Sequence, residues 1–108
     1  MSMVRACGVA EVTSGQPLAV EVEGVDLVVV CSDDEWYAIY DECSHAAIAL
    51  SEGDVEGCEI ECWLHGSRFD LRTGKPTGLP ATEPVAIYPI TVEGDDVLVD
   101  VQNALNNG

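Results

Sequence analysis

The chain has 108 residues and is strongly acidic: twenty Asp and Glu residues against four Lys and Arg residues give a formal net charge of −16. This length suits one domain with one modest core and leaves no room for a second catalytic module. The negative charge makes nucleic acids and anionic membrane surfaces poor partners. No apolar stretch approaches the ~20 residues that span a bilayer, and the start of the chain lacks the features of a signal peptide. We therefore expect a cytoplasmic protein that does not bind membranes.

Short segments rich in Val, Ile and Tyr predict β-strands, and turn signals separate them. The expected strands are Pro17–Val22, Val25–Cys31, Glu35–Tyr40, Glu59–Cys62, Val85–Val92 and Val97–Val101. The turns between them are expected at Glu23-Gly24, Ser32-Asp33-Asp34, Glu56-Gly57, Thr73-Gly74-Lys75-Pro76 and Glu93-Gly94-Asp95-Asp96. Short strands at this spacing predict an all-β fold, with antiparallel sheets in a sandwich or small barrel. A brief helical turn is expected near Ala46–Leu50, and no long helix.

Both histidines of the chain lie close to cysteines. The first pair occurs in Cys43-Ser44-His45, and the second in Cys62-Trp63-Leu64-His65 after sixteen intervening residues. Each pair combines one thiolate with one imidazole, and both are common metal ligands in proteins. The two pairs together predict a metal site with mixed sulfur and nitrogen ligation.

A structural zinc site is the first alternative, because zinc also binds Cys and His in pairs. The first pair here has one residue between its two ligands, whereas zinc-finger pairs usually have two to four. This spacing is an argument against zinc. A zinc-stabilised interaction domain remains the alternative from a different functional class.

The pattern Cys-x-His, a spacer and Cys-x-x-His, followed by Gly66-Ser67, resembles the Rieske iron–sulfur motif. In that family two cysteines hold one iron of a [2Fe–2S] cluster and two histidines hold the other. The resemblance implies that Cys43, His45, Cys62 and His65 bind one such cluster. It also implies the Rieske fold, in which antiparallel sheets carry a cluster-binding subdomain of two loops.

The resemblance covers nearly the whole chain. It implies a single Rieske domain over residues 1–101, with the cluster-binding part at about 41–81. The ligand pairs are then expected at the tips of two loops, Asp41–Ala47 and Cys62–Ser67. The remaining segment, Gln102–Gly108, is polar and is expected to be a frayed C-terminal tail.

The chain lacks the residues for reaction chemistry of its own. A Rieske oxygenase needs a second, mononuclear iron held by two histidines and a carboxylate, and both histidines here are already assigned to the cluster. No Gly-x-Gly-x-x-Gly segment is present to bind a flavin or nicotinamide. We therefore expect an electron carrier and not an enzyme.

The residues around the expected cluster indicate a low reduction potential. High-potential relatives carry a disulfide beside the cluster, and the corresponding positions here are Ile48 and Leu64. They also carry a tyrosine that donates a hydrogen bond to a cysteine sulfur, and Phe69 takes its place here. Ser67, which in the family can donate to a bridging sulfide, is retained. Fewer hydrogen bonds to sulfur favour the oxidised cluster, so we expect a potential near about −150 mV, the low end of the Rieske range.

Two further residues are expected beside the cluster. Trp63 lies between two predicted ligands, where it either forms an apolar rim for a partner or shields the cluster from water. Pro80 lies in the segment Gly78-Leu79-Pro80-Ala81, which matches in placement the proline loop that covers the cluster in this family. An ordinary connecting loop is the alternative for that segment.

Three cysteines remain after the two ligands are assigned: Cys7, Cys31 and Cys58. Cys7 and Cys31 have apolar, strand-like surroundings, and Cys58 is expected in the strand that precedes Cys62. Isolated cysteines of this kind usually act as small buried hydrophobes. The chain has five cysteines in total, and this odd number fits a reducing compartment better than a disulfide framework.

By resemblance, the chain is similar to the ferredoxins of aromatic-ring-hydroxylating dioxygenases, such as those acting on biphenyl, naphthalene or carbazole. Such a ferredoxin would carry single electrons from an NAD(P)H-dependent flavoprotein reductase to the terminal Rieske oxygenase. A small acidic carrier of this kind is expected to be a monomer. The nearest alternative is a Rieske ferredoxin associated with iron–sulfur assembly or with another oxygenase.

Overall fold

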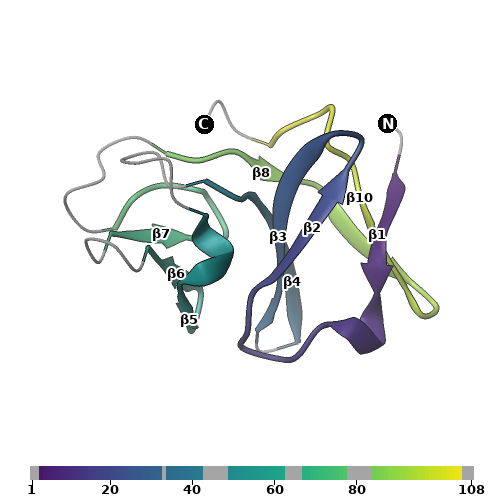
Figure 1. Ribbon diagram of the computed structural model, residues 1–108, viewed down its shortest axis with the longest axis horizontal. Helices are drawn as coiled ribbons and strands as arrows, with labels where there is room; N and C mark the ends of the chain where they lie inside the picture. The colour runs from purple at the N-terminus through teal and green to yellow at the C-terminus, as the bar shows by residue number, and fades with distance from the viewer. Residues whose placement is uncertain (1–2, 33, 43–48, 63–66, 78–83, 106–108) are drawn as a thin grey trace.

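The computed structural model describes residues 3–32, 34–42, 49–62, 67–77 and 84–105. Within these ranges the chain forms ten β-strands and two single-turn 3-10 helices, η1 (Val9–Glu11) and η2 (Leu50–Glu52), but no α-helix. Figure 1 shows the short strands β5, β6 and β7 beside the 3-10 turn η2 at one end of the molecule, and the longer strands at the other. No helix in the described ranges is both long and apolar enough to cross a membrane.

The strands form three antiparallel sheets, which confirms the predicted all-β fold. Sheet A contains, in spatial order, β1 (Val4–Gly8), β10 (Asp96–Val99) and β9 (Ile90–Glu93). Sheet B contains β2 (Leu18–Val22), β3 (Val25–Ser32), β4 (Glu35–Tyr40) and β8 (Ile87–Tyr88). Sheet C contains β5 (Asp54–Glu56), β6 (Glu59–Glu61) and β7 (Arg68–Asp70).

Strand β3 places sheet B between the other two sheets. Leu27, Val28, Val29 and Val30 are all 0% exposed, so β3 is buried on both of its faces. Because side chains alternate along a strand, Leu27 and Val29 pack into the core on the sheet A side. Val28 and Val30 belong to the core that also contains residues of sheet C. The unbroken apolar run of β3 is thus explained by burial on two sides.

The expected strand Val85–Val92 is wrong in one respect, because the chain forms two short strands there in different sheets. Strand β8 pairs with β4 in sheet B, whereas β9 pairs with β10 in sheet A. Pro89 lies between them and has no N–H to donate to a strand ladder. Its carbonyl oxygen instead accepts a hydrogen bond from the Asp100 N–H at 3.1 Å. The chain therefore crosses from one sheet to the other at Pro89.

Three strands lie outside the expected set: β1, β5 and β7. Strands β5 and β7 are three residues long and mostly charged, and each has a single apolar side chain, Val55 or Phe69. Such segments carry little strand propensity of their own. They form strands because these apolar side chains pack into the core that sheets B and C share.

The C-terminal segment differs from the frayed tail expected from its composition. The Leu105 N–H donates to the Ile87 carbonyl oxygen at 2.8 Å. Asp100, which is 0% exposed, accepts hydrogen bonds from the Gln102 N–H at 3.0 Å and from Asn103 Nδ2 at 2.9 Å. Residues 102–105 are therefore tied back onto the domain.

Replacement of a leucine in the central sheet tests this three-layer arrangement. Leu27→Ala should lower the free energy of unfolding by about 2–4 kcal/mol, because the side chain is fully buried. Leu105→Ala is the matched control: Leu105 is 64% exposed, so the loss should stay within about 0.5 kcal/mol. Urea denaturation of both variants measures the difference, and equal losses would contradict the assignment of β3 as the buried central strand.

Candidate metal centre

Of the four predicted ligands, Cys62 lies within the described residues. Cys43, His45 and His65 lie outside them, as do Trp63 and Pro80. The positions Ile48 and Leu64, on which the expected low potential partly rests, also lie outside. The described part of the site therefore consists of Cys62 and of the residues at which the predicted ligand segments begin and end.

Cys62 directly follows strand β6, and its side chain continues the inward face of that strand. Ile60 is 0% exposed and Cys62 is 1% exposed, while Glu61 between them is partly exposed. The alternation of a β-strand thus turns the thiol toward the interior. Cys62 belongs to the same core as Leu50, Ile60 and Phe69. A thiolate in such apolar surroundings requires a metal or another positive partner.

The second ligand segment is closed by a hydrogen bond at its base. The Cys62 N–H donates to the carbonyl oxygen of Ser67 at 2.6 Å. Strands β6 and β7 pair directly below this bond, with Glu61 opposite Arg68. Cys62 and Ser67, the residues on either side of the segment 63–66 that contains His65, are therefore held next to each other. Ser67 itself is 0% exposed.

The first ligand segment is closed by the side chain of Asp41. One carboxylate oxygen accepts from the Ser51 N–H and the other from Ser51 Oγ, each at 2.7 Å. The Asp41 N–H in turn donates to the Asp26 carbonyl oxygen at 3.0 Å, which ties this point to the start of β3. The segment containing Cys43 and His45 thus starts and ends at one fixed point.

Gly53 brings the bases of the two ligand segments together. A Cβ atom at Gly53 would overlap the carbonyl oxygen of Glu61 and lie 2.9 Å from its carbonyl carbon. Only glycine allows the backbone after Ser51 to approach β6 this closely. Since Glu61 immediately precedes Cys62, this contact places the first segment beside the second.

The segment that contains Pro80 also begins and ends at sheet C. The Thr77 N–H donates to the Arg68 carbonyl oxygen at 2.7 Å, and Phe69 forms an isolated β-bridge with Pro76. The Val85 N–H donates to the Gly74 carbonyl oxygen at 2.9 Å. All three segments that carry predicted site residues therefore have anchors in or next to this small sheet.

Phe69 lies in the centre of β7 and is 0% exposed. It shares the core of Cys62, Leu50 and Ile60. Its ring carries no hydroxyl group, so it cannot donate a hydrogen bond to sulfur. This position is consistent with the role that the sequence predicts for Phe69, in which a donor to the cluster is absent.

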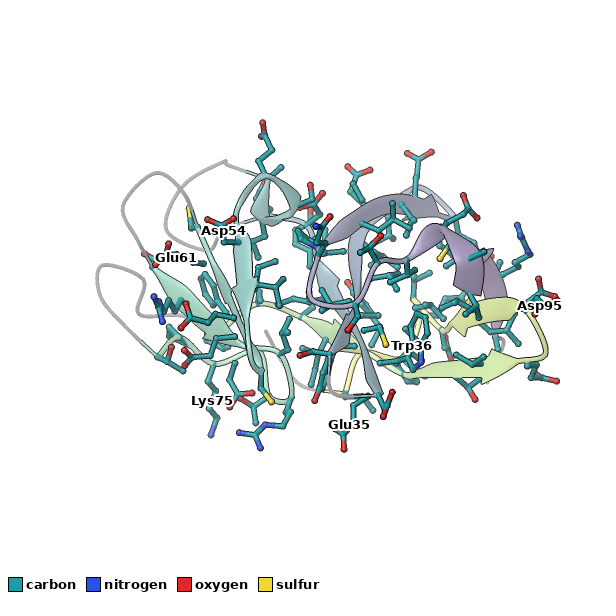
Figure 2. All side chains as sticks on the ribbon, turned by 90° about the horizontal axis from the view of Figure 1, so that it is seen from below. Glu35, Trp36, Asp54, Glu61, Lys75 and Asp95 are labelled. Atoms are coloured by element: carbon teal, nitrogen blue, oxygen red, sulfur yellow. The ribbon has the colours of Figure 1, made fainter. Side chains whose placement is uncertain are left out.

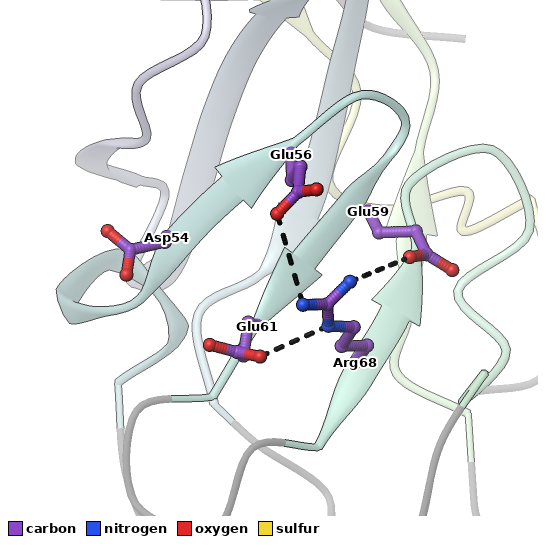
Figure 3. Close-up of a pocket in the computed structure, with 5 residues that line it drawn as sticks. All are labelled: Asp54, Glu56, Glu59, Glu61 and Arg68. Atoms are coloured by element: carbon purple, nitrogen blue, oxygen red, sulfur yellow. Dashed lines mark hydrogen bonds and ion pairs between the residues drawn. The ribbon is translucent and has the colours of Figure 1, made fainter.

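The outer face of sheet C is strongly acidic. Figure 3 shows a shallow pocket on this face, lined by Asp54, Glu56, Glu59, Glu61 and Arg68. The guanidinium group of Arg68 lies 3.1 Å from Glu61, 3.6 Å from Glu59 and 3.9 Å from Glu56. The hydrogen bond to Glu61, together with the other carboxylates, raises the pKa of Arg68. The single cation thus links all three strands of the sheet.

Sheet C is attached to sheet B through the turn between β5 and β6. Ser32 Oγ, at the end of β3, donates to the Gly57 carbonyl oxygen at 2.8 Å. The turn is also held to the end of β7, because the Leu71 N–H donates to the Cys58 carbonyl oxygen at 2.7 Å. The Tyr37 hydroxyl donates to Glu35 at 2.9 Å and lies 3.8 Å from Cys58 Sγ. Burial and then the hydrogen bond to Glu35 raise the pKa of Tyr37.

The three cysteines outside the predicted ligand set have different environments. Cys7 is 3% exposed in β1 and Cys31 is partly buried in β3, and burial raises the pKa of both thiols. Both fit the expected role of small buried side chains. The expected strand position of Cys58 is wrong: the positive φ of Gly57, +61°, forms a tight turn, and Cys58 lies in that turn before β6 begins at Glu59.

The donor set fits a mixed-ligand iron–sulfur cluster. The sequence offers two cysteines and two histidines in two matched pairs, and Cys62, the one predicted ligand among the described residues, is turned into an apolar core. Buried sulfur ligands beside one iron leave the imidazole ligands for the other.

The residues that close the ligand segments, Asp41, Ser51 and Gly53, were not among the predicted site residues. No local pattern marks the Asp41–Ser51 pair, because its bonds span ten positions of the chain.

Comparison with known proteins agrees with this chemistry. The family model of the Rieske [2Fe–2S] domain matches residues 2–89. The biphenyl dioxygenase ferredoxin subunit of Pseudomonas sp. (strain KKS102) is 41% identical over 105 residues, which cover 96% of each chain. The ferredoxin of carbazole 1,9a-dioxygenase from Nocardioides aromaticivorans IC177 superposes with a TM-score of 0.87 at 42% identity, covering 92% of this chain and 97% of that one.

A second solved structure is that of an assembly. A chain in the complex of reduced oxygenase and oxidized ferredoxin of carbazole 1,9a-dioxygenase superposes with a TM-score of 0.83 at 33% identity. The match covers 90% of this chain and 91% of that chain. These findings favour the iron–sulfur interpretation over a zinc-stabilised domain.

Proposed function

Because the chain belongs to the Rieske [2Fe–2S] family, we propose that it is the ferredoxin of a multicomponent aromatic-ring dioxygenase. More than nine-tenths of its length aligns with ferredoxins of such systems, and this alignment is the observation that carries the proposal. The chain contributes no reaction site of its own and acts as an electron-transfer component.

We propose that one [2Fe–2S] cluster is held by Cys43 and Cys62 on the inner iron and by His45 and His65 on the outer iron. The burial of Cys62 supports this assignment, because a sulfur ligand of the inner iron is expected to lie on the protein side of the cluster. The bound cluster supplies a one-electron redox couple. The protein's part is to hold the ligands at fixed positions and to keep water from the sulfur atoms.

The domain proposed for this role covers residues 1–101, with the cluster-binding part at about 41–81. Trp63 and Pro80 are proposed to lie around the outer iron, as an apolar rim that a partner contacts briefly. The anchors of both ligand segments and of the segment 78–83 at sheet C support this grouping.

The proposed partners are a flavoprotein ferredoxin reductase as electron donor and a terminal Rieske oxygenase as acceptor. The crystallised complex of oxygenase and ferredoxin in the carbazole system supports the second partner. We propose a monomeric, cytoplasmic carrier, since the donor NAD(P)H is cytoplasmic and the four cysteines in the described part of the chain are free.

Reconstitution of hydroxylation tests this function. Reductase, oxygenase, NADH and aromatic substrate should give product only when the ferredoxin is added. Cys62→Ser should abolish this stimulation, because it removes a sulfur ligand. The control is Cys7→Ser, which leaves all four ligands in place and should retain the stimulation if the variant folds. Rapid reduction of the cluster without any product from a panel of ring-hydroxylating oxygenases would contradict the dioxygenase assignment.

The reduction potential tests the roles of Phe69 and Ser67. The wild-type reduction potential should be about −150 mV. A value above about +100 mV would contradict the expected lack of hydrogen-bond donors to the cluster sulfur atoms. Phe69→Tyr should raise it by roughly 40 mV, since a hydrogen bond contributes about 1 kcal/mol and 59 mV corresponds to a tenfold change for one electron. Ser67→Ala should lower it by a similar amount. Protein-film voltammetry measures all three proteins, and a shift of either variant in the opposite direction would refute the assigned role.

The ionic-strength dependence of electron transfer tests the use of the acidic surface. A net charge of −16 should steer the chain toward basic surfaces on its partners, so the second-order rate constant should fall by roughly tenfold or more at high salt.

Figure 2 shows Asp54 and Glu61 at one end of the molecule and Asp95 at the other. The double variant Asp54→Asn/Glu56→Gln should slow transfer more than Glu93→Gln/Asp95→Asn, which removes the same charge at the far hairpin. Stopped-flow kinetics that are insensitive to salt would exclude steering.

A further inference from the structure

We propose that Asp41, Ser51 and Gly53 are positioning residues for the cluster: they fix the separation of the two ligand-bearing segments. The inference rests on the proposed function, because it concerns how this chain holds the [2Fe–2S] group. It adds three residues to the ligands and cluster neighbours that the sequence predicts. None of the three needs to touch the cluster to act in this way.

The first step is the closure of the segment that contains Cys43 and His45. Asp41 uses both carboxylate oxygens, and Ser51 uses both its backbone N–H and its hydroxyl group. Two charge-assisted bonds of 2.7 Å between one pair of residues fix their mutual orientation as well as their distance. Asp41 and Ser51, the residues on either side of the segment 42–50, are therefore held together by these bonds.

The second step is the attachment of this closed loop to the rest of the domain. At its start, the Tyr40 N–H donates to the Ala86 carbonyl oxygen at 2.9 Å and the Asp41 N–H to the Asp26 carbonyl oxygen at 3.0 Å. At its end, Leu50 is 0% exposed and lies in the core that includes Cys62. Both ends are thus held by sheet B and by the core that sheets B and C share.

The third step is the contact between the two ligand segments. Gly53 approaches the Glu61 backbone so closely that no Cβ fits. The residue after Glu61 is the ligand Cys62, whose N–H closes the second segment onto Ser67. The two segments are therefore connected through the backbone of Ser51, Glu52 and Gly53 and through the contact of Gly53 with Glu61. No long flexible side chain takes part in this connection. A cluster that needs ligands from both segments depends on this spacing.

Retention of the cluster in variants tests the proposal. Ser51→Ala removes the hydroxyl donor and keeps the backbone bond, so chelator-induced loss of the visible absorbance should be roughly tenfold faster. Asp41→Ala removes both bonds and should accelerate the loss by roughly a hundredfold. Ser51→Thr retains the hydroxyl group and should restore a rate close to that of the wild type. The matched control is Glu52→Gln, an exposed neutralisation in the same 3-10 turn, which should leave the rate unchanged.

A spectroscopic measurement separates positioning from a general loss of stability. The electron paramagnetic resonance lines of the reduced Ser51→Ala protein should broaden, because a looser loop gives a spread of ligand geometries, whereas those of Glu52→Gln should not. Gly53→Ala should lower the cluster content of the purified protein. If this variant does not fold, the positioning role is still tested by the comparison of Ser51→Ala, Ser51→Thr and Glu52→Gln.

Two different results would separate a failure of the proposed function from a failure of this inference alone. A wild-type protein that contains no iron or labile sulfide would overturn the proposed function and this inference with it. A wild-type protein that contains the cluster, with Ser51→Ala and Asp41→Ala equal to Glu52→Gln in loss rate and line width, would overturn the inference alone.

Discussion

The burial of the Cys62 thiol in an apolar core is the constraint from which the rest of the site follows. Strand β6 turns Ile60 and Cys62 inward, so the sulfur lies 1% exposed among aliphatic and aromatic side chains. An ionised thiolate in this environment is costly unless a cation compensates its charge. The iron of the proposed cluster would supply this cation, and the strand that buries the Cys62 side chain ends directly before the predicted ligand segment. The inward position of the Cys62 side chain is therefore a consequence of strand alternation at the end of β6.

This arrangement requires a rigid support, and the three-layer fold provides one. Strand β3 of sheet B is buried on both faces, with the core of sheet A on one side and the core of sheet C on the other. Sheet C alone is too small to be stable, since its three strands contain three residues each. Its inward side chains Val55, Ile60 and Phe69 and the contacts of the β5–β6 turn attach it to sheet B. The ligand segments are thereby connected to the most deeply buried strand of the molecule.

Much of this could be predicted from the sequence, for physical reasons that differ between elements. The strands β2, β3 and β4 are long and apolar, and the two-residue turn Glu23-Gly24 between β2 and β3 is a strong local signal. The ligand pairs, which stay a prediction, could be proposed from the sequence because metal chemistry restricts both residue type and spacing. In contrast, β5 and β7 are strands only because of what they pack against, and the Asp41–Ser51 bonds and the Gly53–Glu61 contact join residues that are distant in the chain. Interactions of this kind leave no periodic pattern in a sequence. The missing N–H of Pro89 indicates a strand break. The apolar residues on both sides of Pro89 nevertheless led to the prediction of one continuous strand.

Mössbauer spectroscopy of protein loaded with iron-57 tests the central claim most directly. The account predicts two iron sites of equal abundance and unequal ligation, one with sulfur ligands alone and the other with sulfide and imidazole nitrogen. Two equivalent sites with sulfur ligands alone, or a colourless protein that retains zinc in place of iron, would contradict it.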